Sequence, residues 1–239
     1  MLTVEQLRHG ARLFSDDCVL SAIRRVREPL HIVERVDGLR AVVAEGGLRD
    51  AGEGLRLLGT LPPLYPEWMG DRSFGEAHGV RFPYIAGEMA NGIASTRLVS
   101  ELAKADLLGF FGAAGLSPSR VEAAVAGLTA DLAARRNWGV NLIHTPAESG
   151  LEDQVAEVLL RQGVRCISMS AFLALTPAVV RCAASGLRLD PRGRILRRTA
   201  VFAKVSRPDI AELFMSPAPA ELLRLLRDRG QLTAGLSVL

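Results

Sequence analysis

The sequence predicts an α/β protein: a partial (β/α)8 barrel of about five βα units, preceded by a small α+β N-terminal cap with a β-hairpin. Two observations predict this fold class. From Phe82 onward, short continuous apolar runs alternate with amphipathic segments of helical period, which is typical of parallel strands covered by helices. Before that point, two β-rich runs flank Asp37-Gly38, the strongest short hairpin signal. We divide the chain into a cap (1–60), a linker (61–80) and an incomplete barrel (81–239).

The cap begins with two predicted helices. Thr3 and Gln6 have the spacing of a capping box, and the stretch from Asp16 to Val26 is typical of a second helix. The predicted hairpin follows. The next stretches, EGGLRDAGEGLRLLG and TLPPLYPEW, are rich in glycine and proline, so we interpret them as a linker that carries no chemistry.

Apolar runs predict five barrel strands: Phe82–Ala86, Leu107–Gly112, Trp138–Ile143, Val164–Ser170 and Ala200–Val205. The clearest helix follows the second strand, because Ser117 is a good N-cap and Pro118 suits a first turn. Its apolar stripe recurs at helical spacing and consists of Val121, Val125, Leu128 and Leu132.

Three further helices are predicted at Ser95–Ala105, Glu152–Gln162 and Ala220–Arg229. We assign the buried face of the first to Leu98, Leu102 and Ala105, and that of the second to Val155, Val158 and Leu159. Between the fourth and fifth strands, LRLDPRGRILRR contains an Asp-Pro-Arg-Gly turn, which predicts a protruding hairpin.

Both a doubly wound sheet and a barrel are compatible with this alternation. The first strand-to-helix turn lacks the G-x-G-x-x-G pattern, and no acidic residue closes a second strand, as a dinucleotide site requires. Polar residues recur instead at the carboxyl ends of several strands, which is typical of barrels. We therefore expect a barrel.

Composition excludes several classes of protein. The 239 residues are 49% hydrophobic and 23% charged, with a net charge of +3, an ordinary globular balance. The longest apolar run, Leu107–Leu116, is shorter than the ~20 residues of a membrane span, and the first residues have no signal-peptide block, so we expect a cytoplasmic protein. Cys18, Cys166 and Cys182 lack the spacing of a disulfide framework or a zinc site. The modest charge and 5% aromatic content do not indicate nucleic acid.

The most informative stretch is RFPYIAGEMANGIAS, Arg81 to Ser95. A buried strand ends there in a loop of mostly small residues before a helical pattern begins. Small residues allow the backbone to approach a flat or phosphorylated ligand closely. The alternative is that Gly87 and Gly92 serve the turn alone.

Four stretches together resemble the PfaD family, from about residue 20 to about residue 230: LPPLYPEWMGDRSFGEAHGVRFPYIAGEMANGIAS, LLGFFGAAGLSPSRVEAAV, GVNLIHTP and AKVSRPDIA. That family comprises trans-acting enoyl reductases of polyketide and polyunsaturated fatty-acid synthesis, related to nitronate monooxygenases and FMN-containing enoyl-acyl-carrier-protein reductases. The resemblance implies a barrel in which FMN lies at the carboxyl ends of the strands, takes a hydride from NAD(P)H and passes it to an α,β-unsaturated thioester.

The resemblance also implies which residues contact the flavin: Gly87, Met89, Ala90, Asn91, Gly92, Asn141 and Lys204. Asn141 would direct its amide to the polar edge of the ring, and Lys204 would place a cation near the pyrimidine or ribityl side. Two structural alternatives remain open. Asn141 caps its strand, or Lys204 pairs with a carboxylate.

Two other features have both a functional and a structural interpretation. His144 follows the third strand, where a catalytic proton donor would stand, and the alternative is a surface histidine with satisfied hydrogen bonds. The arginines of residues 187–198 suit the docking of an acidic carrier protein, and the alternative is a solvated basic hairpin.

The chain departs from the family at two points. Glu88 stands where relatives carry a small residue, and a carboxylate there would repel the reduced, anionic flavin. Only about five strands fit the pattern, and no Gly-Gly-His segment matches the family's later strand.

We therefore expect the N-terminal half of an FMN-dependent enoyl reductase that acts in trans on carrier-bound enoyl thioesters and is incomplete alone. Its expected partners are an acyl carrier protein or polyketide synthase, and a second chain or copy that completes the barrel. The alternatives are a nitronate monooxygenase-like flavoenzyme and a non-catalytic remnant or interaction module.

Overall fold

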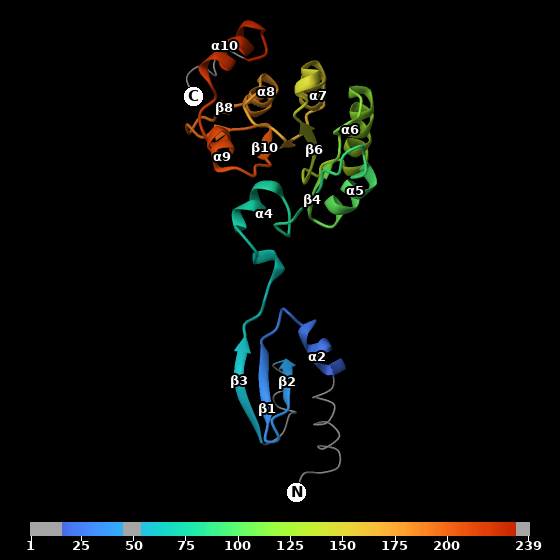
Figure 1. Ribbon diagram of the computed structural model, residues 1–239, viewed down its shortest axis with the longest axis vertical. Coiled ribbons are helices and arrows are strands. Elements are labelled where there is room, and N and C mark those ends of the chain that lie inside the picture. The colour runs from blue at the N-terminus through green and yellow to red at the C-terminus, as the bar shows by residue number, and fades with distance from the viewer. Residues whose placement is uncertain (1–15, 45–53, 233–239) are drawn as a thin grey trace. The chain divides into compact units, whose positions relative to one another are not determined.

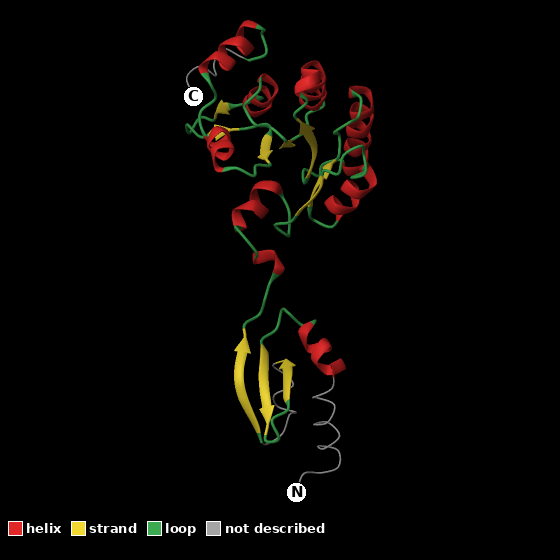
Figure 2. Cartoon of the chain, in the orientation of Figure 1, coloured by secondary structure: helices red, strands yellow, loops and turns green. Residues whose placement is uncertain are grey.

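The computed structural model describes residues 16–44 and 54–232 and divides into two compact units, 1–70 and 71–239 (Figures 1 and 2). The predicted capping box at Thr3 and Gln6 lies outside the described residues. In the part of the chain that the structure describes, no helix is long and apolar enough to cross a bilayer.

The N-terminal unit contains helix α2 (Asp16–Ile23) and a three-stranded antiparallel sheet of order β2-β1-β3. The predicted hairpin is confirmed, because β1 (Leu30–Arg35) pairs with β2 (Arg40–Ala44) and Gly38 has the positive φ of 84° that this turn requires. Its small core is formed by Val33, Ala41 and Val43.

The linker interpretation is wrong for β3 (Leu55–Leu61), which pairs with β1. Most side chains of β3 are exposed or half-buried, so the strand lacks the alternation that would have revealed it. The strand is held in place by backbone hydrogen bonds to β1 and by an ion pair between Arg56 and Glu34 at 2.5 Å. A short 3-10 turn, η1 (Pro66–Trp68), follows.

The C-terminal unit is built on a five-stranded parallel sheet of order β10-β7-β6-β5-β4. Its strands are β4 (Ile85–Gly87), β5 (Leu108–Phe111), β6 (Trp138–Ile143), β7 (Cys166–Ser170) and β10 (Ala200–Ala203). The helices are α4 (Arg72–His78), α5 (Thr96–Lys104), α6 (Pro118–Leu132), α7 (Ser149–Arg161), α8 (Pro177–Ala184), α9 (Pro208–Met215) and α10 (Ala220–Asp228), with a 3-10 turn η2 (Pro146–Glu148) before α7.

The strand order follows the chain without reversal, and this confirms a barrel wall over a doubly wound sheet. Crossovers between parallel strands are right-handed, so a sheet wound in one direction places every crossover helix on the same face. Helices α5 to α8 lie along one side of the strands in Figure 1. The main core lies between them and the sheet, and it includes all four residues of the predicted α6 stripe.

Helix α5 buries a face one residue away from the expected one. Val99, Ser100 and Ala103 are buried, whereas Ala105 lies past the helix end and is exposed. Gly109 on β5 allows α5 to lie close to the sheet, because a Cβ there would lie 3.2 Å from both Val99 and Leu102.

The opposite, inner face of the sheet carries a second core of Val80, Leu108, Phe110 and Cys166. Helix α4, which falls in the predicted linker, partly covers it through Phe74. Asp71 caps the start of α4 and Gly79 ends it with a left-handed φ of 64°, so start and stop signals were present in the sequence.

Several boundaries differ from expectation. β4 starts at Ile85 rather than Phe82, and Pro83 in the predicted strand has no N–H to donate to a ladder. Helices α8 and α9 were not predicted, although each begins with a proline at its first turn. The hairpin of residues 187–198 is confirmed as β8 (Arg188–Leu189) paired with β9 (Ile195–Leu196).

Candidate functional site

Two of the polar residues predicted at the strand ends, Asn141 and Lys204, lie at the carboxyl edge of the sheet on its inner face. Successive side chains of a strand point to opposite faces. On β6, Val140 and Leu142 pack into the helix-side core, so Asn141 between them points to the inner face. On β7, Ile167 and Met169 pack into the same core, so their neighbours Ser168 and Ser170 also point inward. The register aligns Asn141 with Ser168. Lys204 extends β10 by one hydrogen bond, from its backbone N–H to the oxygen of Met169.

These groups form a connected polar network with Glu88, which we call the edge network (Glu88, Asn141, Ser170 and Lys204). The Lys204 ammonium lies 2.9 Å from a Glu88 carboxylate oxygen, and Ser170 Oγ donates to the same oxygen at 3.5 Å. The Asn141 amide donates to Ser170 Oγ at 2.8 Å and to the Ser168 carbonyl at 3.2 Å. The network thus joins two of the seven residues that the family resemblance implied, Asn141 and Lys204.

The pairing of Glu88 with Lys204 reveals the curvature of the sheet. Glu88 follows β4 and Lys204 follows β10, and these strands lie at opposite ends of the strand order. In a flat sheet, four strand spacings would separate them by about 19 Å, too far for the two side chains to meet. The sheet is therefore rolled toward its inner face, as a barrel wall is.

The pair also changes the expected electrostatics at Glu88. The side chain of Glu88 is 10% exposed, so an unpaired carboxylate would be costly there, and the Lys204 ammonium offsets its charge. The expected repulsion of a reduced flavin by Glu88 is therefore reduced by a neighbouring cation. For Lys204, the carboxylate-paired alternative is the one that the structure displays.

The loop of residues 87–92 is packed by backbone contacts within the chain. A Cβ on Gly87 would lie 2.2 Å from the Phe110 oxygen, and Gly92 has a φ of 71°. The Gly92 and Asn91 N–H groups donate to the oxygens of Gly112 and Ala114. Met89 and Ala90 are exposed. The glycines here thus have a structural reason, and the exposed Met89 and Ala90 form an accessible rim.

His144 lies on the helix side of the sheet, apart from the edge network. Its Nδ1 is 2.9 Å from a carboxylate oxygen of the buried Glu152, and its ring lies against Phe172. Glu152 also accepts from the Thr176 hydroxyl at 2.5 Å. These contacts tie β6 to the starts of α7 and α8. They favour the interpretation of His144 as a histidine with satisfied hydrogen bonds.

The remaining reactive side chains near the sheet are not activated. Burial raises the pKa of the Cys166 thiol to about 11 and that of Cys182 to about 12, so neither is a ready thiolate. The Ser168 hydroxyl is fully buried on the inner face and has no hydrogen-bond partner. Within residues 16–44 and 54–232, no cluster of histidine, cysteine or acidic residues is arranged to hold a metal ion.

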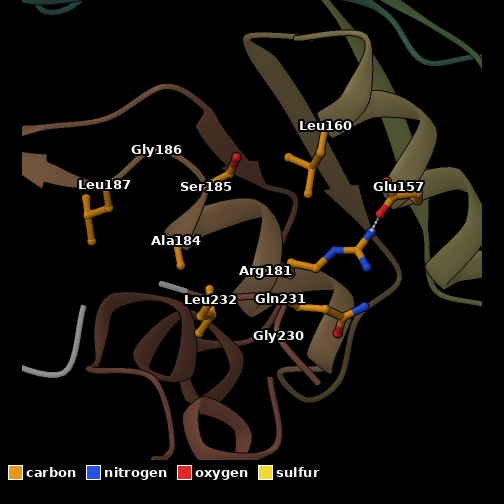
Figure 3. Close-up of a pocket in the computed structure, with 10 residues that line it drawn as sticks. All are labelled: Glu157, Leu160, Arg181, Ala184, Ser185, Gly186, Leu187, Gly230, Gln231 and Leu232. Carbon is orange, nitrogen blue, oxygen red and sulfur yellow. Dashed lines mark ion pairs between the residues drawn. The ribbon is translucent and has the colours of Figure 1, made fainter. Parts of the chain in front are cut away.

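A separate cavity of about 360 Å³ lies between α7, α8 and residues 230–232 (Figure 3). None of its lining residues belongs to the edge network. The buried Arg181 pairs there with Glu157 at 3.0 Å, while its Nε has no partner.

Comparisons with known proteins relate the chain to proteins of polyketide and polyunsaturated fatty-acid biosynthesis. It is 36% identical over 167 residues to the polyketide biosynthesis protein PksE of Bacillus subtilis, covering 70% of this chain and 22% of the relative. It is 44% identical over 165 residues to a polyunsaturated fatty acid synthase subunit of Thraustochytrium, covering 69% and 11%. A crystal structure of the enoyl reductase domain of MlnA, from the macrolactin cluster of Bacillus amyloliquefaciens, superimposes with a TM-score of 0.67 at 32% identity, covering 70% and 38%.

Over about 70% of its length the chain is similar to enoyl reductases of the PfaD type. No family model matches it. It spans about a fifth or less of the length of the two curated relatives and 38% of the MlnA domain.

The edge network fits the flavin that the family implies. The Lys204 ammonium is exposed and has N–H donors beyond the one that faces Glu88, and the carbonyl groups on the polar edge of a flavin are acceptors. Both N–H groups of Asn141, in contrast, are already donated to Ser168 and Ser170. The buried Ser168 hydroxyl beside Asn141 still lacks a partner, as an incompletely satisfied polar pocket does. The residues present therefore suit a flat ligand that carries acceptors.

Lys204→Met is expected to lower the free energy of unfolding by about 1–2 kcal/mol, because it leaves the Glu88 carboxylate with only Ser170 as a partner. Adding Glu88→Gln should recover part of this loss, giving a coupling of about 1 kcal/mol in a urea-unfolding double-mutant cycle. The more exposed pair Arg161–Glu122 is the control and should couple by less than about 0.5 kcal/mol. Additive effects at 88 and 204 would contradict the pairing.

Proposed function

We propose that the chain is the flavin-holding part of an FMN-dependent enoyl reductase that acts in trans on carrier-bound enoyl thioesters in polyketide or polyunsaturated fatty-acid synthesis. The observation that carries the proposal is the edge network. It lies at the carboxyl edge of a rolled parallel sheet, where barrel enzymes hold their ligands, in a chain 32% identical to an enoyl reductase domain. The names of the relatives support the two biosynthetic settings.

In this proposal each residue of the network has a role toward the cofactor. When bound, FMN supplies the hydride transfer, with NAD(P)H as the reductant. Asn141, whose two amide N–H groups are donated to Ser168 and Ser170, would present its amide oxygen to the polar edge of the ring. Lys204 provides a cation for charge that develops on the ring, while Glu88 holds the ammonium in place. The loop of residues 87–92 forms the rim.

The proposed partners are an acyl carrier protein or polyketide synthase and a polypeptide that completes the barrel. The outer strands β4 and β10 each have one neighbour in the sheet of the described chain. A second chain with further strands, or a second copy, would satisfy these edges. We also propose a cytoplasmic location, in keeping with the free thiols of Cys166 and Cys182.

The test is a titration of the purified chain with FMN, followed by the quenching of flavin fluorescence. We expect saturable binding that Lys204→Met and Asn141→Ala each weaken about tenfold, the loss of one good hydrogen bond or ion contact. Arg120→Ala, an exposed change in the first turn of α6, should bind as the wild type does.

Measurements of enzyme turnover distinguish the reductase from the two alternative functions. Oxidation of NADPH with a carrier-bound crotonyl thioester, once the remaining barrel strands are supplied as a second polypeptide, supports the reductase. Oxygen consumption with an alkyl nitronate would favour the nitronate monooxygenase alternative. A folded chain that binds no FMN under either condition would contradict the proposal and favour a non-catalytic interaction module.

A further inference from the structure

Two adjoining clefts lie at the amino edge of the sheet, opposite the edge network. Their volumes are about 500 Å³ and about 610 Å³. Six arginines line them: Arg135, Arg136, Arg165, Arg188, Arg197 and Arg198. Four of these, Arg136, Arg165, Arg197 and Arg198, line both clefts. We call this surface the arginine groove.

The groove has more positive charge than the chain itself neutralises. Arg135 pairs with Asp106 at 2.9 Å, whereas none of the other five forms an ion pair within residues 16–44 and 54–232. Glu76 is the carboxylate that lines the groove in that part of the chain. The positive charge of the groove also acts on His78, because burial and the charge of Arg165 both lower the pKa of its imidazole. Like charges gathered in this way repel one another, so a negatively charged occupant would stabilise the groove.

The helix C-termini at this edge account for only part of the positive charge in the groove. Helices α6 and α7 end at this edge, and the partial negative charge of a helix C-terminus attracts cations. Arg135 donates to the carbonyl of Ala103 near the end of α5, and Arg198 lies beside Gly163, just past α7. Arg188 and Arg197 come instead from the β8–β9 hairpin and its exit.

The same geometry argues against a phosphate ligand. Phosphate sites commonly use the N–H groups and positive dipole of a helix N-terminus. In this sheet the crossover helices begin at the carboxyl edge and end at the groove, so the backbone here offers carbonyl oxygens. The guanidinium groups come from separate segments around residues 136, 165, 188 and 197, and those at 136, 188 and 197 are exposed. Such a broad surface suits many carboxylates better than one compact anion.

We propose that the arginine groove docks an acidic face of a partner protein. The groove lies at the sheet edge opposite the edge network, so a partner held there anchors the chain in an assembly and leaves the carboxyl edge free for substrate. This docking function goes beyond the proposed reductase activity and does not depend on flavin.

The test measures binding of a fluorescein-labelled acidic helical peptide of about 20 residues, with glutamates four positions apart, by fluorescence anisotropy. Arg136→Glu with Arg197→Glu should weaken binding at least about tenfold. The control, Arg97→Glu with Arg120→Glu, makes the same change in net charge on exposed arginines in the first turns of α5 and α6. It should change the affinity less than about twofold.

Three outcomes would overturn the proposal. One is equal weakening by the control pair, which would mean that only net charge matters. Another is displacement of the peptide by inorganic pyrophosphate at lower concentrations than by unlabelled peptide, which would indicate a phosphate site. The last is tighter binding of duplex DNA than of the peptide. Circular dichroism and the FMN titration on the same variants check folding and separate a failure here from a failure of the flavin proposal.

Discussion

Gly112→Ala is expected to destabilise the C-terminal unit by at least about 3 kcal/mol, or to prevent its folding. A Cβ at this position would lie 1.7 Å from the backbone oxygen of Met89 and 2.6 Å from its carbonyl carbon. Neither segment can move aside cheaply. The Gly112 N–H donates to Ala94, and its carbonyl accepts from Gly92, so the two backbones are held together from both sides.

The measurement is the free energy of unfolding by urea or the melting temperature. Gly127→Ala is the matched control, because Gly127 lies inside α6 and a Cβ there would meet no neighbouring atom within 4 Å. This change should stabilise the chain by about 0.5–1 kcal/mol through helix propensity. A Gly112→Ala protein within about 1 kcal/mol of the wild type would show that the loop of residues 87–92 is not clamped against 110–116.

Phe110→Ala is expected to cost about 4 kcal/mol of stability. Phe110 is fully buried on the inner face, where its ring meets Phe202 edge-on at a centroid distance of 5.2 Å. The ring also fills the space above Gly139, where a Cβ would lie 2.5 Å from it. The inner core is small, so few neighbours are available to fill the cavity that the substitution leaves.

This prediction separates a rolled sheet from a flat one. Phe110 belongs to β5 and Phe202 to β10, three positions apart in the strand order, so their contact requires curvature. In a double-mutant cycle, Phe110→Leu and Phe202→Leu should couple by about 0.5–1.5 kcal/mol. Leu189→Ala, a change on the exposed hairpin, should stay within about 0.5 kcal/mol of the wild type. Additive effects at 110 and 202 would indicate that the two rings do not meet.

Local signals predicted most of the barrel wall. The strand Trp138–Ile143 has the expected bounds, and Ser117 caps α6 through a hydrogen bond from the Arg120 N–H. Such elements are found in the sequence because their periodicity and caps lie within a few residues. Elements that are only partly buried lack a clear hydrophobic periodicity, so the sequence did not predict them. β3 shows no alternation, and α4 lay in a stretch that its glycine and proline content assigned to a linker.

The site was predicted in part for a similar reason. Asn141 and Lys204 were implied by the family resemblance, through the short motifs GVNLIHTP and AKVSRPDIA that contain them. Glu88 was seen as a departure from the family, but its partner was missed, since the two residues lie far apart in the sequence. His144 also ends a strand, yet strand alternation turns it toward Glu152 and away from the inner face.

The sequence by itself determined the βα order, the caps, the hairpin turns and the family resemblance, because each depends on neighbouring residues or on whole motifs. Only the tertiary structure decided that the sheet rolls until Glu88 and Lys204, at opposite ends of the strand order, lie 2.9 Å apart. Curvature of this kind is the sum of twists and packing contacts along all five strands, and no short stretch of sequence contains it.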